Sequence, residues 1–126
     1  MIIKKTNDLL VIHETPCEEI HINSNSITIE FDDINEARRK IFFCPFQAVR
    51  ITTIDCVDLD TVIVPESYSN GRYRRYLLEC IDSPWIDNLK SQLVDSTDDF
   101  LEKSKHFMLD LGDNLLEIIA WSANIL

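Results

Sequence analysis

The segment KHFMLDLGDNLLEIIA, residues 105–120, is the clearest guide to the fold. Apolar residues occupy alternate positions before and after Gly112-Asp113, and a period of two is typical of β-strands. A two-residue loop that begins with glycine favours a type II′ turn. The segment therefore predicts an antiparallel hairpin. One face of this hairpin is apolar and carries Phe107, Leu109, Leu111, Leu116, Ile118 and Ala120.

Two segments in the first half of the chain also have strand patterns. Residues 26–31 alternate strictly, which places Ile27, Ile29 and Phe31 on one face of a half-buried strand. Residues 46–54 are rich in β-branched side chains, which favour extended backbone. Both segments are expected to join an antiparallel sheet.

Three shorter segments are less regular. Residues 9–13 and 61–64 are short apolar runs that predict strands. Residues 72–81 match both a helical and a strand pattern. The turn signal Asn70-Gly71, in which both residues tolerate positive φ, stands directly before this segment and favours the strand.

One helix has a clear beginning in the sequence. Ser83 can cap it, and Pro84 suits the first helical position because its missing N–H would have no partner there. The helix is expected to run to about Val94. Its apolar face would carry Trp85, Leu89 and Leu93.

Two further segments allow only short helical structure. Asp33 and Glu36 have capping-box spacing for a helix through Arg39, but a segment this short fits a helical turn or a bend equally well. Residues 100–101 could form a short turn. The whole pattern predicts one α+β domain over residues 1–126, a twisted and mainly antiparallel sheet with one or two helices packed on one face.

The composition indicates a globular, acidic chain. It has 126 residues, of which 45% are hydrophobic and 27% charged, and its formal net charge is -10. A negative surface repels phosphate backbones and anionic membranes, so neither nucleic acid nor membrane is an expected partner. The same charge attracts a cationic protein. Many acidic proteins, however, are acidic only because charge keeps them soluble.

The N-terminus and the cysteines indicate the cytoplasm. The first residues contain no apolar stretch long enough for a signal peptide, and no run approaches a membrane span. The four cysteines are widely spaced and form no CxxC or zinc-like pattern. Cys56 and Cys80 lie in apolar stretches, so both are expected to be buried free thiols.

The C-terminal hairpin brings together the one constellation that could carry chemistry. Its two-residue loop predicts that Met108 lies opposite Glu117, with His106 and Asp110 diagonal to Glu117 on the same face. Such a set could bind a metal or transfer a proton. The alternatives are a solvated sheet face or, because Leu115, Ile119 and Trp121 share it, a face that is partly covered. With no nucleophile motif and only two glycines, we expect no catalytic site, no metal and no cofactor.

Two sets of residues are candidates for binding a protein partner. Asp55, Asp58 and Asp60 interrupt a strand pattern, and they are expected to lie beside the hairpin loop. Tyr68 and Tyr73 stand among arginines, and tyrosine and arginine are frequent in interface hot spots. An edge strand explains the same pattern without a partner, and nucleic-acid stacking is a third interpretation.

The second half of the chain resembles a known class of protein. Residues 76–89 read as a strand followed by a serine-capped helix, then come Lys105-His106-Phe107 and residues 113–120. This order is similar to that in immunity proteins of contact-dependent inhibition and other polymorphic toxin systems of bacteria. The likeness covers under half of the chain.

The resemblance implies a cytoplasmic protein that binds a specific toxin domain and blocks its active site. Toxins of this kind that are nucleases are commonly basic, which would suit the negative charge. Carboxylates would then take the places of substrate phosphates. The alternatives are a regulatory subunit unrelated to toxins and a small enzyme built on His106, Asp110 and Glu117.

Overall fold

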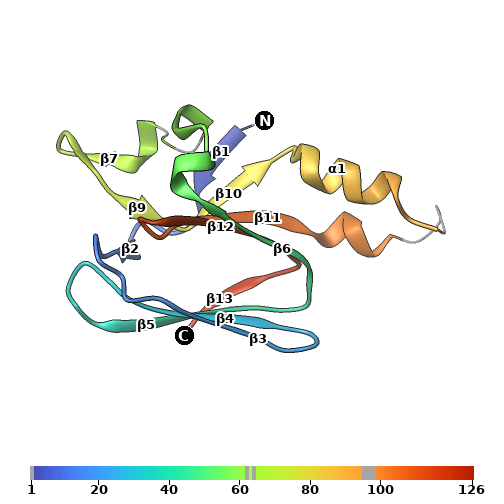
Figure 1. Ribbon diagram of the computed structural model, residues 1–126, viewed down its shortest axis with the longest axis horizontal. Coiled ribbons are helices and arrows are strands. Elements are labelled where there is room, and N and C mark those ends of the chain that lie inside the picture. Colours follow the sequence, from blue (N-terminus) through green and yellow to red (C-terminus); the bar gives the residue numbers. More distant parts are fainter. Residues whose placement is uncertain (1, 62, 64, 95–98) are drawn as a thin grey trace.

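The computed structural model describes residues 2–61, 63, 65–94 and 99–126 and consists mainly of two stacked antiparallel sheets (Figure 1). The α+β class and the mainly antiparallel sheet are therefore confirmed. The larger sheet has the strand order β1 (Ile2–Lys5), β10 (Leu78–Ile81), β11 (Lys105–Asp110), β12 (Asn114–Ala120) and β6 (Phe46–Thr53). The smaller sheet has the order β13 (Ala123–Ile125), β5 (Arg38–Phe43), β4 (Ile27–Asp32) and β3 (Glu19–Ile22).

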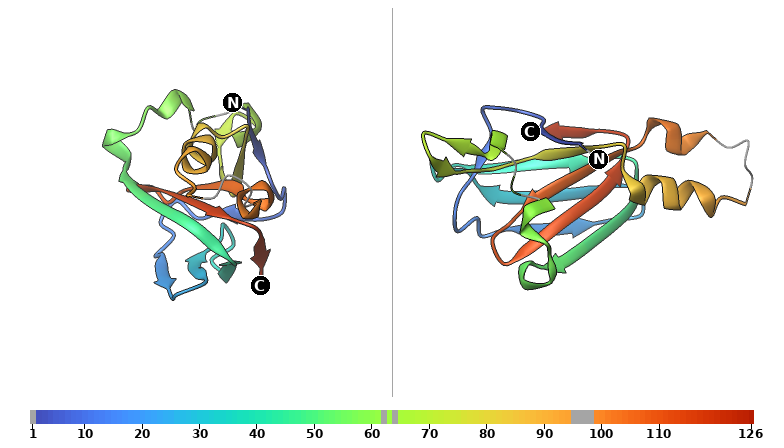
Figure 2. Two further views of the ribbon diagram at one scale, coloured as in Figure 1. Left: turned by 90° about the vertical axis from the view of Figure 1, so that its right-hand side faces the viewer. Right: turned by 90° about the horizontal axis from the view of Figure 1, so that it is seen from above.

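The remaining elements lie around the larger sheet. Two short pairs connect β2 (Val11–Ile12) with β9 (Arg75–Tyr76) and β7 (Tyr68–Ser69) with β8 (Arg72–Tyr73). The helix α1 (Pro84–Ser91) lies on the side of the larger sheet that faces away from the smaller sheet (Figure 2). Four single-turn 3₁₀ helices are η1 (Ile54–Cys56), η2 (Leu59–Thr61), η3 (Pro65–Ser67) and η4 (Phe100–Lys103). No helix in the described ranges is long and apolar enough to cross a membrane.

The main core fills the space between the two sheets. Ile27, Ile29 and Phe31 are fully buried on one face of β4, as their alternation predicted. The ring of Phe43 on β5 meets that of Phe107 on β11 edge to face, with centroids 5.5 Å apart. Burying an aliphatic or aromatic side chain of this size contributes about 1.5–3 kcal/mol each, so these rows hold the sheets together.

The C-terminal hairpin has the register that its turn predicted. Leu111 N–H donates to the Asn114 carbonyl at 2.9 Å, and Met108 pairs with Glu117. Gly112 has φ of +94°, a conformation that a residue with a Cβ rarely adopts. The sequence-based prediction is therefore confirmed for both strands and for the loop between them.

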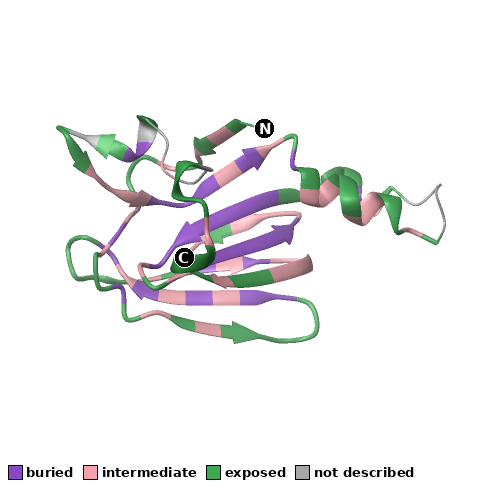
Figure 3. Cartoon of the chain, turned by 45° about the horizontal axis from the view of Figure 1, so that its top comes forward, coloured by how far each residue is buried: buried purple, intermediate pink, exposed green. Residues whose placement is uncertain are grey.

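The outer face of β11 and β12 is covered rather than solvated. Both strands are buried along almost their whole length (Figure 3). A second apolar cluster lies on this face beneath η1. It comprises Tyr76, Leu78, Cys80, Met108 and Leu115. Of the two alternatives for the hairpin's second face, the covered face is therefore confirmed and the solvated face is wrong, because the chain after β6 folds back over it.

Several local predictions are confirmed. Residues 72–81 are extended and contribute β8, β9 and β10, and Asn70-Gly71 forms the turn between β7 and β8 with φ of 53° and 75°. Ser83 caps α1 by accepting the N–H of Ile86. The helix ends at Ser91, before the predicted Val94.

Two further local predictions had different outcomes. Of the two structures that fitted the segment after Asp33, the turn is confirmed: Asp33 Oδ1 accepts the N–H groups of Asn35 and Ala37, and β5 begins after this turn. The strand expected over residues 61–64 is not formed at Thr61, which ends η2, while Val62 and Val64 lie outside the described residues.

The two cysteines expected to be buried differ in their environment. Cys80 is buried in the second apolar cluster, whereas Cys56 is exposed in η1. The prediction for Cys56 is therefore wrong. Burial raises the pKa of the Cys80 thiol above its ordinary value, so this side chain behaves as a small hydrophobic group.

Candidate functional site

A buried polar network occupies the outer face of the larger sheet. His106 on β11 and Glu117 on β12 lie diagonally across the hairpin, and His106 Nε2–H donates to Glu117 Oε1 at 2.9 Å. Both side chains are buried, with 3% and 5% of their surfaces exposed. The sequence-based pairing of these two residues is therefore confirmed.

Arg50 neutralises the carboxylate of this network from the neighbouring strand. It lies directly opposite Glu117 in the pairing of β6 with β12. Its Nε donates to Oε2 at 2.8 Å and its Nη2 donates to Oε1 at 3.0 Å, a fork that matches a carboxylate. Burial by itself would raise the pKa of Glu117, but the hydrogen bonds from His106 and Arg50 outweigh it and lower the pKa to about 2.

The network continues from His106 into the beginning of α1. Ser83 Oγ and His106 Nδ1 are hydrogen-bonded at 2.7 Å, and the same oxygen accepts the N–H of Ile86 at 3.3 Å. Both ring nitrogens of His106 are thus occupied by Ser83 and Glu117. The helix cap and the sheet are joined through one imidazole ring.

An indole covers the network from above. The ring of Trp85 meets His106 edge to face with centroids 5.3 Å apart, and the guanidinium of Arg50 lies 4.2 Å from the centre of the indole. A cavity of about 710 Å³ opens beside these rings. It is lined by Arg50, Thr52, Cys56, Val57, Pro84, Trp85, Asn88, His106, Met108, Leu115 and Glu117.

The order Ser83–His106–Glu117 could in principle pass a proton, as in nucleophilic hydrolases. Ser83, however, is only 3% exposed, and its oxygen already holds the helix N-terminus. The Glu117 carboxylate is fully engaged by Arg50 and His106. The arrangement therefore favours a structural clamp between sheet and helix over a catalytic group.

Asp110, the third member of the predicted constellation, belongs to a different set of contacts. Its Oδ2 accepts the hydroxyl of Tyr73 at 2.8 Å, and its Oδ1 accepts the N–H of Gly112 at 2.9 Å. Nε of Arg75 lies 3.4 Å from Oδ1. Asp110 thus fixes the hairpin loop and Tyr73. Burial and the hydrogen bond to Asp110 raise the pKa of the Tyr73 phenol above its ordinary value.

The predicted partner-binding carboxylates lie at the loop end of the hairpin. Asp55, Asp58 and Asp60 are exposed, and Ile54 N–H donates to the carbonyl of Asp113 at 2.9 Å, which attaches η1 to the hairpin loop. Within the described ranges, Asp55, Asp60 and Asp113 form no ion pair. Their charge is therefore directed to solvent.

The predicted tyrosines lie at the same end. Tyr73 reaches Asp110 next to the hairpin loop, and its ring lies 5.9 Å from that of Tyr68. Tyr68 is 49% exposed. The structure therefore places both predicted sets, which are separate in the sequence, beside one loop.

A possible metal-ligating group lies on the other sheet. Glu19, His21 and Glu30 place one ligand atom each within 4.8 Å of one another across β3 and β4. Glu30 also contacts Lys40 at 3.5 Å, and Glu19 and His21 are exposed. This group was not predicted from the sequence, although the spacing of Glu19 and His21 on one strand could have indicated it.

Comparisons with known proteins assign no activity to these groups. No protein-family model matches the chain, and no curated protein matches it in sequence. A solved structure to which it is similar is an uncharacterized protein from Neisseria gonorrhoeae. The two chains are 14% identical with a TM-score of 0.49, and the match covers 99% of this chain and 97% of that chain.

Proposed function

We propose that this protein is a small acidic module that binds and neutralises a basic toxin domain in the bacterial cytoplasm. The observation that carries the proposal is the loop end of the β11–β12 hairpin, to which an exposed acidic segment and a pair of tyrosines are both attached. We call this surface the acidic end. It consists of Asp55, Asp58, Asp60, Tyr68, Tyr73 and Asp113.

The charge of the acidic end supports a basic partner. Asp55, Asp60 and Asp113 form no ion pair within the described part of the chain, whereas Asp32 and Asp33 on the other sheet pair with arginines. Unpaired carboxylates on an exposed surface attract a cationic partner and speed its association. They also lose little on binding, because no internal ion pair must break first.

The tyrosines supply the contact area that charge alone lacks. Tyr68 is about half exposed, while the hydroxyl of Tyr73 is held by Asp110. A ring held before binding costs less conformational entropy when the partner arrives. Aromatic anchors surrounded by polar groups are typical of binding hot spots.

The toxin as partner is supported by the resemblance of residues 76–89, 105–107 and 113–120 to immunity proteins and by the net charge of -10. Neutralisation would be steric. The module would cover the active-site cleft of a basic enzyme, and its carboxylates would occupy positions that substrate phosphates take. The network of Ser83, His106 and Glu117 would then keep the binding face rigid.

Co-purification from the native host, in low and then in high salt, tests the proposal. We expect a stoichiometric basic protein domain whose activity the module inhibits. The variant D55K/D58K/D60K should lower the association rate with that domain by about tenfold or more at low salt, and less at high salt.

The matched control is E19K/E36K/E102K, which changes the net charge equally at exposed positions outside the acidic end. An equal fall in the association rate of both variants would show that only net charge matters, and the acidic end would then be excluded as the binding site. A stable partner that is not a toxin would keep the binding role and exclude immunity. No partner at either salt concentration would overturn the proposal.

A further inference from the structure

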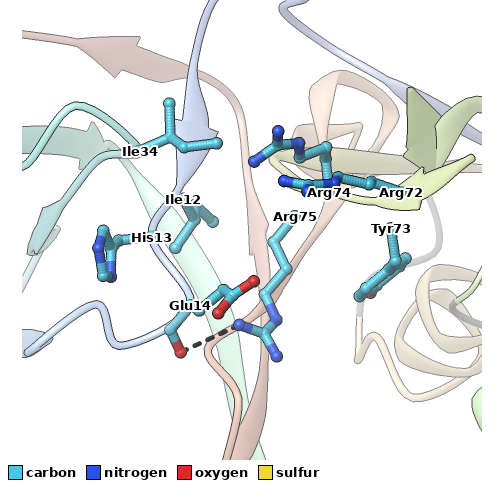
Figure 4. Close-up of a pocket in the computed structure, with 8 residues that line it drawn as sticks. All are labelled: Ile12, His13, Glu14, Ile34, Arg72, Tyr73, Arg74 and Arg75. Carbon is cyan, nitrogen blue, oxygen red and sulfur yellow. Dashed lines mark hydrogen bonds between the residues drawn. The ribbon is translucent and has the colours of Figure 1, made fainter. Parts of the chain in front are cut away.

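A second cleft, of opposite charge, lies beside β9 on the far side of the hairpin loop. It has a volume of about 650 Å³ (Figure 4). Its walls come from β2 with the residues that follow it, from the turn after β4, and from β8 and β9. The side chains that matter here are Ile12, Glu14, Ile34, Arg72, Arg74 and Arg75.

Arg72 and Arg74 supply the positive charge of this cleft. They are two residues apart in the sequence, and Figure 4 shows both side chains extending into the cleft on the side of Ile34. In the described part of the chain neither forms an ion pair. Two adjacent guanidinium groups repel each other, so an anion between them would be stabilised. This arrangement is unexpected in a chain with 22 acidic residues.

The third arginine is held in place and forms part of the wall. Arg75 Nη1 donates to the Glu14 carbonyl at 3.1 Å (Figure 4). Arg75 Nε lies 3.4 Å from Oδ1 of Asp110. Its Nε is buried without a hydrogen bond. Arg75 already balances Asp110, so the positive charge available to a ligand comes from Arg72 and Arg74, and the Glu14 carboxylate, which also lines the cleft, offsets part of it.

We propose that this cleft binds a small molecule through a phosphate monoester group. A phosphate monoester carries a charge of about -1.5 to -2 at neutral pH, which matches two guanidinium groups, whereas a carboxylate matches one. The planar donors of arginine suit its tetrahedral oxygens. The cleft is larger than phosphate, and Ile34 offers an apolar wall for the organic part of the ligand.

A phosphorylated small molecule fits better than a nucleic acid strand. The net charge of -10 and the carboxylates across the hairpin loop repel a long polyanion, while a single phosphate needs only the local field of the two arginines. Tyr73 of the acidic end also lines this cleft. The proposal nevertheless does not depend on the protein partner, because its ligand is different and its charge comes from Arg72 and Arg74.

Titration calorimetry with phenyl phosphate, inorganic phosphate and benzoate tests the site. We expect saturable binding of phenyl phosphate, weaker binding of inorganic phosphate because Ile34 then has no apolar partner, and binding of benzoate at least about tenfold weaker. The variant R72Q/R74Q should weaken phenyl phosphate binding about a hundredfold, since it removes two sets of charge-assisted hydrogen bonds.

Two variants make the result decisive. R72K/R74K keeps the charge but loses the fork of donors, so its affinity should lie between those of the wild type and R72Q/R74Q. K4Q/K105Q makes the same charge change at exposed lysines outside the cleft and should bind like the wild type. The proposal is overturned by the absence of saturable phenyl phosphate binding, by equal affinity for benzoate, or by equal loss in K4Q/K105Q. Tighter binding of a single-stranded oligonucleotide than of phenyl phosphate would replace it with a nucleic-acid site.

Discussion

Replacing Glu117 by glutamine measures the contribution of the buried network. The substitution keeps the shape of the side chain and one acceptor oxygen but removes the charge. Arg50 then loses a charge-assisted fork, and the buried His106 loses its charged acceptor. Both losses fall on the folded state, because in the unfolded chain all three groups are solvated.

The magnitude follows from the pKa of Glu117, which is lowered from 4.5 to about 2. A shift of this size corresponds to about 3 kcal/mol at neutral pH. Because the side chain of Arg50 is 48% exposed and solvent screens its charge, we expect E117Q to cost about 2 kcal/mol. For a chain of this length the melting temperature should fall by about 6–10 °C.

The stabilisation contributed by the Glu117 carboxylate increases with pH. A carboxyl whose pKa is lowered by folding stabilises the protein fully above its unfolded pKa, and this stabilisation is lost as the pH falls from 4.5 toward 2. The stability difference between the wild type and E117Q should therefore be constant above about pH 5.5. At about pH 3 it should be less than half as large, because only the wild type can take up the proton.

Urea unfolding of wild type, E117Q and E102Q at neutral and acidic pH is the assay. E102Q removes an exposed carboxylate that pairs with Lys90 at 3.2 Å, and it should change stability by about 0.5 kcal/mol or less. Similar losses in E117Q and E102Q would refute the account of a buried clamp. So would a loss in E117Q that stays constant down to pH 3, because the charge of Glu117 would then not be its source.

Three other substitutions test separate contacts, each by thermal or urea unfolding. Ser83→Ala should cost about 1–2 kcal/mol, because α1 loses its cap and His106 loses a partner; no change would mean that water replaces the hydroxyl. Gly112→Ala should cost about 1–2 kcal/mol because alanine is strained at φ of +94°, whereas the added Cβ would meet only ordinary contacts and cause no clash; a neutral result would show that the loop can relax. Tyr73→Phe should cost about 1–2 kcal/mol by leaving the buried Asp110 one hydrogen bond short. In the wild type, tyrosinate absorbance should show the Tyr73 phenol ionising above its ordinary pKa. The contact between Tyr73 and Asp110 then stabilises the fold below pH 10, and this stabilisation is lost only as the pH rises further. Ionisation of Tyr73 at about pH 10 would contradict that contact.

The amino-acid sequence alone determined the elements that depend on interactions between residues close together in the chain. The register of residues 105–120 follows from a two-residue loop and a period of two, because a slip by one residue would turn every apolar side chain to the other face. The beginning of α1 follows from Ser83 and Pro84, whose effects need only the next helical turn. The alternation of residues 26–31 likewise predicted which side chains would be buried.

Some residues can adopt more than one local structure or environment, because the competing structures differ little in energy. Asp33 can cap a helix or close a turn, and the pairing of β4 with β5 selects the turn. Cys56 lies in an apolar stretch, yet η1 leaves it exposed. Neither outcome is encoded by the neighbouring residues alone.

Tertiary structure decided the contacts of the site that join segments distant in the sequence. The fork of Arg50 on Glu117 spans 67 positions, and it exists because β6 becomes the edge strand next to β12. The sequence predicted that His106 and Glu117 meet, because one hairpin contains both, but it could not separate Asp110 from them. The partner of Asp110 is Tyr73, brought from a distant hairpin. Contacts within one hairpin follow from periodicity and loop length. Contacts between distant segments depend on which surfaces must be buried together, and that is settled only when the whole chain packs.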